Sequence, residues 1–339
     1  MQTTTLQQET FGKEQIGVHE MNYVIIDLEW NQCPEGKEKE EKMLPFEIIE
    51  IGAVKVNQER EIIDEFHEII KPAVYTVLNK KTKEIVPVEM KELRHGRAFP
   101  QVIREFFKWC GKEYRFATWG PVDLVELQRN MKYYDIQVFH KPFVYYDVQK
   151  LFALIYENNK TPRTLLYAVD QLQLEHSETF HRALSDARYT AKIFQKLDTK
   201  TVAKYFSVDY FWNPKSKKEE IYLQFDGYSK YISMEFATKE QLMADKDVRS
   251  YICFQCGKRA AKKINWFSNN SKNYYGLFFC REHGYLKGKI RMKKSITNKY
   301  FAVKTIKGIT REEAEALRNK NKKVHEKKNR RLENKFFKE

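Results

Sequence analysis

The sequence predicts an α/β protein whose mixed sheet is flanked by helices, followed by a small β-rich module and a basic helical tail. Apolar β-branched runs alternate with helical apolar patterns over the first 200 residues, as is typical of helices packed on a sheet. Two cysteine-containing pairs follow between residues 253 and 283, and from residue 287 onward nineteen Lys and Arg face six Asp and Glu. We therefore expect a flexible lead-in over 1–20, an α/β domain over 21–205, a β-rich module over 213–300 and a basic tail over 301–339.

Three strands open the expected α/β domain. Each is an apolar run rich in β-branched residues, and a polar turn over 57–60 joins the second run directly to the third. Because so short a connection makes neighbouring strands antiparallel, the sheet should begin with an antiparallel arrangement. The expected strands are residues 22–28, 47–57 and 61–70.

Helices and short strands then alternate up to residue 197. Apolar residues recur at helical spacing over 99–110, and a Gly-Pro step separates a short apolar strand from the next helix. The expected elements are helix 99–110, strand 116–118, helix 123–133, strand 143–147, helix 148–156, helix 164–172 and a helix ending near residue 197. This interleaving fits an α/β architecture.

The first expected strand ends in two carboxylates one residue apart, Asp27 and Glu29. Alternate residues of a strand share a face, so both should project to one side while Leu28 points into the core. Two carboxylates on one face provide hard oxygen ligands for divalent cations. Taken alone, the pair also fits an ordinary polar strand end, so the interpretation depends on residues further along the chain.

Three more side chains complete the pattern. Asp123 should lie in the first turn of a helix, where a carboxylate suits the helix dipole, and a simple helix cap is the alternative. Four residues separate His181 from Asp186, so a loop histidine and an early-helix carboxylate can converge on one point. A solitary histidine is more often a solvated or core residue. Only the combination of four carboxylates and one histidine indicates a metal-dependent phosphoryl-cleaving site.

Together these motifs resemble the DEDDh-type 3′–5′ exonucleases of the ribonuclease-H-like superfamily. The resemblance rests on Asp27-x-Glu29, Asp123 and His181-x4-Asp186, and it covers about residues 21–200. Within the family, the Trp30-Asn31-Gln32 continuation is closest to the histone-mRNA exonuclease and sporulation-inhibitor branches.

The resemblance implies a ribonuclease-H-like fold and two-metal hydrolysis that releases nucleoside 5′-monophosphates from a 3′ end. It implies that Asp27 bridges both cations, that Glu29 and Asp186 complete the tighter site, and that Asp123 takes part in metal binding largely through metal-bound water. His181 would take the proton from the attacking water, a task suited to an imidazole with an ordinary pKa of about 6.5. The all-oxygen ligand set implies Mg²⁺ or Mn²⁺.

A second metal site is indicated by Cys253-x2-Cys256 and Cys280-x2-His283. Two such pairs are typical of tetrahedral zinc, and four protein ligands leave no open position for water, so the zinc should be structural. Gly257 and Gly284 follow the two pairs, where a tight turn requires a residue that tolerates positive φ. Coincidental cysteines or a redox pair are the alternatives.

The surroundings of the cysteine pairs predict a zinc-ribbon-like module. Asp226-Gly227 separates two apolar runs at 220–225 and 231–236, which is typical of a hairpin. A second hairpin is expected between 264–267 and 274–279. The polar segment 213–218 should be the linker from the α/β domain.

The C-terminal tail is expected to contact nucleic acid. Thr310 and Glu313 form a capping box, so a helix should begin there and continue into the basic run 327–331. Such a helix neutralises phosphates without reading sequence, and the segments 291–294 and 300–301 should extend the surface with stacking aromatics. A solubilising or ribosome-docking tail is the alternative.

Composition excludes several other classes of protein. The chain has 42% hydrophobic residues, enough for packed cores, but no uncharged apolar stretch approaches the ~20 residues that span a bilayer. Residues 1–20 are polar and lack the apolar block of a secretory signal. Five cysteines, an odd number, argue against a disulfide framework and for a reducing, cytoplasmic environment, with Cys33 and Cys110 taking no part in metal binding.

We therefore expect a cytoplasmic exonuclease on single-stranded nucleic acid that prefers RNA, because the first motif's continuation resembles branches that act on RNA. A DNA-directed proofreading or repair exonuclease stays open, since nothing in the sequence tests for a 2′-hydroxyl. A regulatory protein that uses the exonuclease fold to dock a nucleic acid or protein also stays open, although all five catalytic-type residues are present. A homodimer is compatible with the resemblance.

Overall fold

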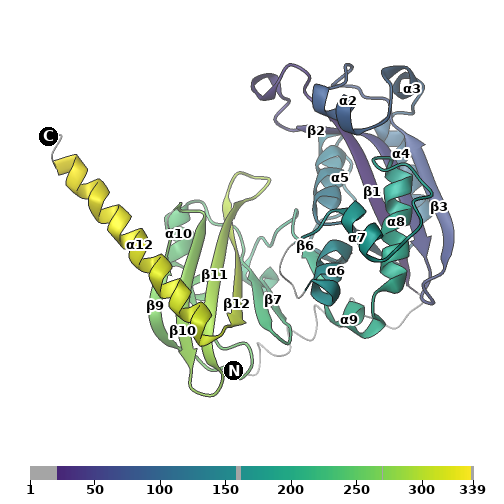
Figure 1. Cartoon of the computed structure of the whole chain (residues 1–339). Coiled ribbons are helices and arrows are strands. Elements are labelled where there is room, and N and C mark those ends of the chain that lie inside the picture. The colour runs from purple at the N-terminus through teal and green to yellow at the C-terminus, as the bar shows by residue number, and fades with distance from the viewer. Residues whose placement is uncertain (1–20, 158–161, 269, 337–339) are drawn as a thin grey trace. The chain divides into compact units, whose positions relative to one another are not determined.

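The computed structural model describes residues 21–157, 162–268 and 270–336. These residues divide into two compact units, one ending at Phe211 and the other beginning at Trp212 (Figure 1). The lead-in expected over 1–20 lies outside the described residues. Within the described ranges, every helix is either too short or too polar to span a bilayer.

The first unit is built on a six-stranded mixed sheet with the strand order β3-β2-β1-β4-β5-β6. The β1–β2, β2–β3 and β5–β6 pairs are antiparallel, whereas β1–β4 and β4–β5 are parallel. The antiparallel opening and the mixed sheet expected from the sequence are therefore confirmed. The strands are β1 (Asn22–Gln32), β2 (Phe46–Val56), β3 (Ile62–Ile69), β4 (Tyr114–Thr118), β5 (Phe143–Asp147) and β6 (Ser207–Asp209).

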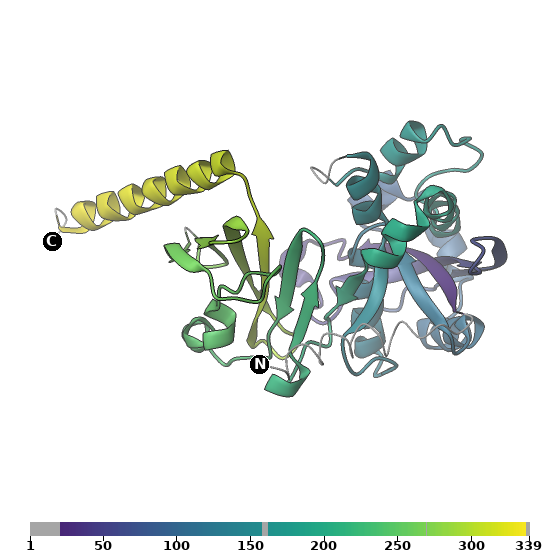
Figure 2. The same cartoon turned by 90° about the horizontal axis from the view of Figure 1, so that it is seen from below.

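Helices cover both faces of this sheet, as Figure 2 shows. Val24, Ile26 and Leu28 of β1 pack with α4 and α5, whereas Ile25 packs with α6, α7 and α8. The alternation of β1 thus divides the core into two layers. The longer helices are α4 (Phe99–Cys110), α5 (Val122–Tyr133), α6 (Val148–Tyr156), α7 (Leu165–Gln171) and α8 (Ala183–Lys196). The shorter ones are η1 (Lys37–Lys39), α2 (Lys80–Ile85), α3 (Met90–Arg94) and α9 (Thr199–Lys204).

The second unit contains a six-stranded sheet in the order β7-β8-β12-β11-β10-β9, with antiparallel neighbours throughout. Both expected hairpins are present, as β7–β8 and β9–β10. The strands are β7 (Ile221–Gln224), β8 (Tyr228–Ile232), β9 (Ala261–Phe267), β10 (Asn273–Cys280), β11 (Gly284–Lys294) and β12 (Tyr300–Gly308). The short helices are η2 (Lys217–Glu219), α10 (Lys239–Ala244) and α11 (Lys246–Arg249).

The boundary expected at residue 301 is wrong, because β12 lies inside this sheet between β8 and β11. Apolar residues alternate along Phe301-Ala302-Val303-Lys304-Thr305-Ile306, which favours a strand despite the lysine. Phe301 is only 3% exposed, so it is not available to stack on bases as the sequence suggested. The helical tail begins only at α12 (Arg311–Phe336).

The start of α12 is fixed by its capping box. The Glu313 N–H donates to the Thr310 hydroxyl at 3.2 Å, and the Thr310 N–H donates to the Glu313 carboxylate at 3.1 Å, as expected from the sequence. The first turns then pack on the sheet, because Ala314 and Leu317 are buried in one cluster with Leu277 of β10. The beginning of the tail is therefore docked on the second unit.

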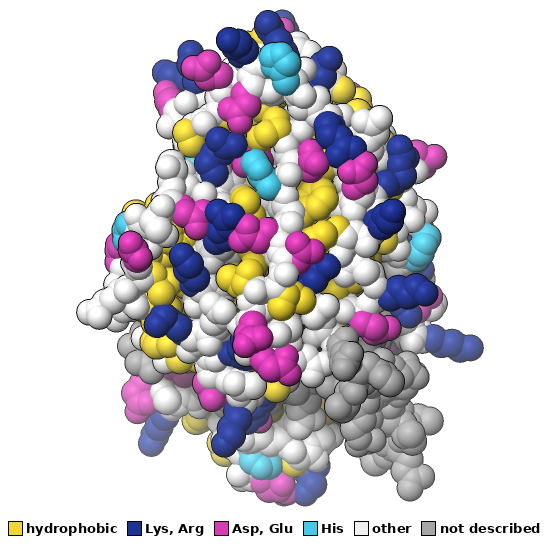
Figure 3. All heavy atoms as spheres, turned by 90° about the vertical axis from the view of Figure 1, so that its right-hand side faces the viewer, with side chains coloured by type: hydrophobic (Ala, Val, Ile, Leu, Met, Phe, Trp, Pro, Cys, Tyr) yellow, Lys and Arg dark blue, Asp and Glu magenta, His cyan; other side chains and the backbone are white. Residues whose placement is uncertain are grey.

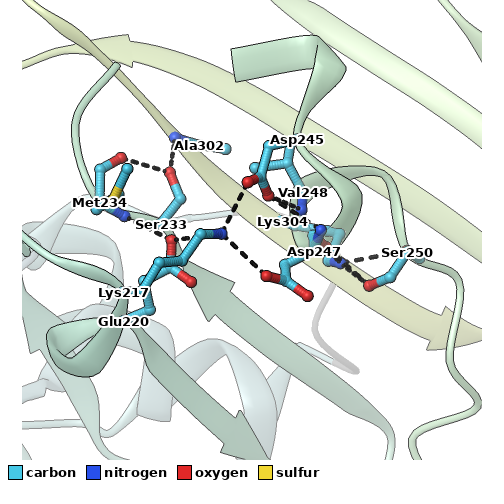
Figure 4. Close-up of polar contacts among 10 residues, drawn as sticks. All are labelled: Lys217, Glu220, Ser233, Met234, Asp245, Asp247, Val248, Ser250, Ala302 and Lys304. Atoms are coloured by element: carbon cyan, nitrogen blue, oxygen red, sulfur yellow. Dashed lines mark hydrogen bonds and ion pairs between the residues drawn. The ribbon is translucent and has the colours of Figure 1, made fainter. Parts of the chain in front are cut away.

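The segment 213–218, expected to be a linker, is anchored to the second unit. The Lys217 ammonium lies 2.8 Å from the Asp245 carboxylate, 2.9 Å from that of Asp247 and 3.3 Å from that of Glu220 (Figure 4). Beside it, the buried Lys304 ammonium donates to the hydroxyl and carbonyl of Ser250 at the end of α11. Periodicity could not reveal these contacts, because charged residues look alike in a linker and in an ion-pair network.

Charge is divided unequally between the two parts of the chain. Residues 212–339 contain 32 of the 61 Lys and Arg but only 14 of the 46 Asp and Glu. On the face shown in Figure 3, acidic and basic side chains are interspersed. The excess positive charge therefore belongs to the second unit.

Candidate active site and metal centre

Asp27 and Glu29 project from one face of β1, as strand alternation requires. Asp27 lies opposite Gly52 of β2, and Glu29 lies opposite Glu50. A bulge follows Glu29, at the point where the strand leaves the regular ladder. Leu28 is 3% exposed and packs in the opposite layer. The structure thus places both carboxylates together at one edge of the core.

Gly52 lets α8 approach this pair of strands. A Cβ atom at this position would lie 2.0 Å from the backbone nitrogen of Leu184 and 2.1 Å from the carbonyl carbon of Ala183. Only a glycine therefore allows the first turn of α8 to rest on β2 beside Asp27. This contact positions the loop and the turn that carry His181 and Asp186.

Asp186 lies in that first turn and is 7% exposed. One of its oxygens, Oδ2, accepts a hydrogen bond from the backbone N–H of His181 at 3.1 Å. The other, Oδ1, is buried and has no hydrogen-bond partner among the described residues. His181 has a φ of 63°, a left-handed conformation that is uncommon for residues other than glycine, and its side chain is exposed. The bond to Asp186 stabilises this turn of the loop.

Asp123 approaches the same group from the first turn of α5. It is 6% exposed and accepts hydrogen bonds from its own N–H and from that of Leu28. Asn130, also on α5, holds the helix to β2: its Nδ2 donates to the carbonyl of Phe46 at 2.8 Å, and its Oδ1 accepts from the N–H of Ile48 at 3.0 Å. Asn130 could not be identified from the sequence, because one asparagine within a helix carries no signal of its partner.

Burial raises the pKa of all four carboxyl groups, and neighbouring carboxylates add to the shifts. Burial raises the pKa of Glu29 to about 8, helped by the charges of Asp186, Glu50 and Asp123. Burial also raises the pKa of Asp123 to about 7 and that of Asp186 to about 6, although backbone N–H groups oppose both shifts. The pKa of Asp27 is well above its usual range, because of burial and then of Asp123 and Asp186. Concentrated negative charge of this kind requires protons or cations.

The group fits divalent cations. Ligand atoms of Glu29, His181 and Asp186 all lie within 4.8 Å of one another. The unpartnered Oδ1 of Asp186 is a buried acceptor that a cation would satisfy. The carboxylates are the hard oxygen ligands that Mg²⁺ and Mn²⁺ prefer. The structure therefore brings Glu29, His181 and Asp186 within ligand distance of one another, and Asp27 and Asp123 lie close enough to interact electrostatically with Asp186.

A second layer of charged residues was not expected from the sequence. Glu50 has a side chain only 1% exposed, and it contacts the His67 Nε2 at 2.7 Å and the Arg182 guanidinium at 3.1 Å. Arg182 also reaches Glu92 at 3.2 Å. The only signal in the sequence was that Arg182 directly follows His181, since the strand position of Glu50 looks like ordinary alternation.

The second candidate site is the cluster of Cys253, Cys256, Cys280 and His283. The Cys256 and Cys280 sulfurs lie 3.6 Å apart, and the His283 Nδ1 lies 3.6 Å from the sulfurs of Cys253 and Cys280. These separations suit a tetrahedral ion with bonds of about 2.3 Å to sulfur and about 2.0 Å to nitrogen.

Two glycines shape the turns around this cluster. Gly257 and Gly284 have φ values of 68° and 74°, as expected from the sequence. By contrast, Cys33 and Cys110 are buried elsewhere, and burial raises the pKa of Cys110 to about 12. These two cysteines are therefore packing residues.

Comparison with known proteins agrees with this geometry. The family described as Exonuclease matches residues 24–194, half of the chain, and the protein belongs to that family. Its fold and motifs define it more narrowly as a DEDDh-type 3′–5′ exonuclease.

Three curated relatives show how far the similarity extends. The probable 3′-5′ exonuclease KapD of Bacillus subtilis (strain 168) is 28% identical over 52% of this chain and 83% of its own length. The PolC-type DNA polymerase III of Thermotoga petrophila is 28% identical over 44% of this chain but only 10% of its own length. The 3′-5′ exoribonuclease 1 of Rattus norvegicus is 23% identical over 50% of each chain. The chain thus spans half or less of the length of the last two.

Proposed function

We propose that the protein is a two-metal-dependent 3′–5′ exonuclease that hydrolyses single-stranded nucleic acid, preferably RNA, and releases nucleoside 5′-monophosphates. The observation that carries the proposal is the convergence of four carboxylates with raised pKa values around the unpartnered Oδ1 of Asp186.

The candidate site residues have different roles, according to where each side chain lies. Asp27, Glu29, Asp123 and Asp186 are the residues that would hold Mg²⁺ or Mn²⁺. When bound, such cations neutralise phosphate charge and stabilise the attacking and leaving oxygens. His181 stands on the exposed side of the group, where its imidazole accepts the proton of the attacking water. Its loop is held to the core through Asp186 and through the neighbouring Arg182.

RNA is favoured over DNA because the exoribonuclease from rat, by its name, acts on RNA. DNA is the second candidate, because the PolC-type relative is by name a DNA polymerase and is slightly more similar in the matched region. The basic second unit suits either backbone, since phosphate charge is common to both.

The test uses 5′-labelled single-stranded RNA and DNA of the same sequence, each with and without added Mg²⁺ or Mn²⁺. We expect metal-dependent ladders that shorten from the 3′ end, faster on RNA, with nucleoside 5′-monophosphates as products. Asp27→Asn and Asp186→Asn should abolish cleavage and largely spare binding, because each removes a metal ligand rather than a contact surface. Glu113→Gln, which changes an exposed carboxylate, serves as the matched control.

Each outcome has a definite meaning. Undiminished turnover in either Asn variant would refute the assigned site. Faster cleavage of DNA would replace the RNA preference by a DNA-directed role. Good binding with no cleavage of either strand under any metal would favour the regulatory docking protein instead.

We further propose that the Cys253, Cys256, Cys280 and His283 cluster holds one structural zinc ion. The cluster joins the loop before β9 to the turn between β10 and β11, so the metal would cross-link these two segments. Metal analysis of the purified protein should give one zinc per chain, and Cys256→Ser should lose it. A zinc-free protein of unchanged stability would refute the site.

A further inference from the structure

A group of cations surrounds one tyrosine on the second unit. The Tyr275 ring on β10 has the Lys320 ammonium of α12 3.6 Å from its centroid. The ammonium groups of Lys289 and Lys287, both on β11, lie 5.8 and 5.9 Å from the same centroid. Cations within about 6 Å of an aromatic face are attracted to it. Tyr275 therefore gathers three lysines from two elements.

The strand geometry extends this group into a row. Residues 287, 289 and 291 alternate with buried residues, so Lys287, Lys289 and Arg291 project from the same face about 7 Å apart. The opposite face belongs to the core, because Leu286 and Ile290 are at most 1% exposed. The row therefore results from the alternation of side chains along β11 and does not belong to a flexible charged segment.

The position of Lys320 depends on the docking of α12. Leu317, one turn earlier, is 4% exposed and packs in a cluster with Phe267 and Leu277 of the sheet. The Tyr275 ring lies 6.1 Å from that of Phe267, so it is held at the edge of the same cluster. Helix α12 and the sheet together therefore hold the cations in fixed positions.

The described side chains include no counter-charge paired with these cations. Among the residues whose side chains are described, Lys287, Lys289, Arg291 and Lys320 form no ion pair. Burial lowers the pKa of Lys289, and the charges of Arg291, Lys287 and Lys320 add to this effect. Holding like charges together without counter-charges costs free energy. A bound polyanion offsets this cost, because its negative charges reduce the repulsion.

We propose that Tyr275 and the cations Lys287, Lys289, Arg291 and Lys320 form a binding site for successive phosphates of single-stranded nucleic acid. This cation cage rests on the proposed function in one respect, because the strand that it holds is the exonuclease substrate. The lysines and Arg291 contact phosphates, whereas Tyr275 positions the ammonium groups, since Lys320 already covers its face. A lipid surface fits less well, because Ile252 is the only large apolar side chain that the described part of this unit exposes.

The test measures binding of a fluorescent single-stranded RNA to the full chain carrying Asp27→Asn, across a range of salt concentrations. The cage variant is Lys287→Gln, Lys289→Gln and Lys320→Gln together. The matched control is Lys322→Gln, Lys323→Gln and Lys327→Gln, which removes the same charge from exposed positions of α12. We expect the cage variant to bind at least about 10-fold more weakly, with a salt slope smaller by about 2, and the control to change much less.

Substitutions of Tyr275 distinguish a positioning role of its ring from a role in folding. Tyr275→Leu keeps an apolar side chain against Phe267 but removes the ring, and it should weaken binding, whereas Tyr275→Phe should restore it. Circular dichroism and zinc content establish that each variant is folded. In the active background, the cage variant should raise KM for long strands and leave cleavage of a dinucleotide unchanged.

Several results would overturn the cage. If the cage and control variants weakened RNA binding equally, binding would depend on diffuse charge on α12. If neither variant weakened binding, the proposed site would be refuted. Cage-dependent binding of anionic phospholipid vesicles without RNA binding would assign the surface to lipid. RNA binding that depends on the cage, in a chain that cleaves nothing, would refute the proposed function and leave the cage intact.

Discussion

The Arg182 guanidinium donates its Nε–H to both carboxylate oxygens of Glu50, at 3.2 and 3.1 Å. Glu50 is on β2, directly opposite Glu29, and Arg182 directly precedes α8. The pair therefore joins the strand that faces the candidate metal-binding carboxylates to the loop that carries His181. Its burial makes this contact costly to break on one side only.

Glu50→Gln should lower kcat by roughly 10–100-fold, the usual effect of removing a residue that orients metal ligands. The loss of one negative charge also lets the pKa of Glu29 fall, so the activity profile should shift to lower pH. Steady-state rates from pH 6 to 9 would measure both effects. The matched control is Glu65→Gln, which breaks the Glu65–Arg188 contact of α8 away from the site. Equal rates for the two variants would mean that Glu50 does not position the loop.

His181→Ala should lower the rate by roughly 10²–10⁴-fold, the usual range for a general acid–base group. Metal-dependent stabilisation should change far less, because the four carboxylates remain. Single-turnover rates across pH 6 to 9 would measure the loss. A variant that keeps the wild-type rate over this range would show that His181 is not the base, and His176→Ala provides a control at a neighbouring exposed histidine.

Without added Mg²⁺ or Mn²⁺, stability should fall as the pH rises from 6 to about 8. The carboxyl groups of Asp186, Asp123 and Glu29 have pKa values raised to about 6, 7 and 8, so the native state binds more protons than the unfolded state in this range. The stabilisation that comes from these bound protons is complete only below the ordinary carboxyl pKa values. It is lost as the pH rises through the raised pKa values. Thermal denaturation at several pH values would measure it.

Added Mg²⁺ should oppose that loss, because cations bind the ionised carboxylates. The increase in Tm on adding Mg²⁺ should therefore be larger at pH 8.5 than at pH 6, and smaller in Asp123→Asn. Chelators should be left out of these samples, since they would also remove zinc. A Tm increase that is the same at both pH values would contradict the raised pKa values.

Removing the proposed zinc ion should unfold the second unit and leave the first unit able to cleave short substrates. The cluster lies wholly between Cys253 and His283, whereas all five candidate catalytic residues precede Phe211. Limited proteolysis after chelation, followed by readdition of Mg²⁺ and a dinucleotide assay, would separate the two effects. If chelation abolished dinucleotide cleavage even with Mg²⁺ restored, zinc would have a role beyond the second unit.

The sequence by itself determined the main helices and strands of the first unit and the identities of the candidate site residues. Strand alternation placed Asp27 and Glu29 on one face, and helical spacing predicted α4 (Phe99–Cys110) residue for residue. Local signals were enough at these positions, because side-chain direction and helix caps depend on neighbours along the chain. The capping box of Thr310 and Glu313 is a further example.

Only the tertiary structure decided which distant residues meet. The close approach of α8 to Gly52, the pairing of Glu50 with Arg182 and the place of β12 inside a sheet all join residues far apart in the chain. A period-2 pattern reports which side of a strand is buried, but not what buries it. The cation cage around Tyr275 was hidden for the same reason: the sequence shows many lysines, and packing alone selects the three that share one ring.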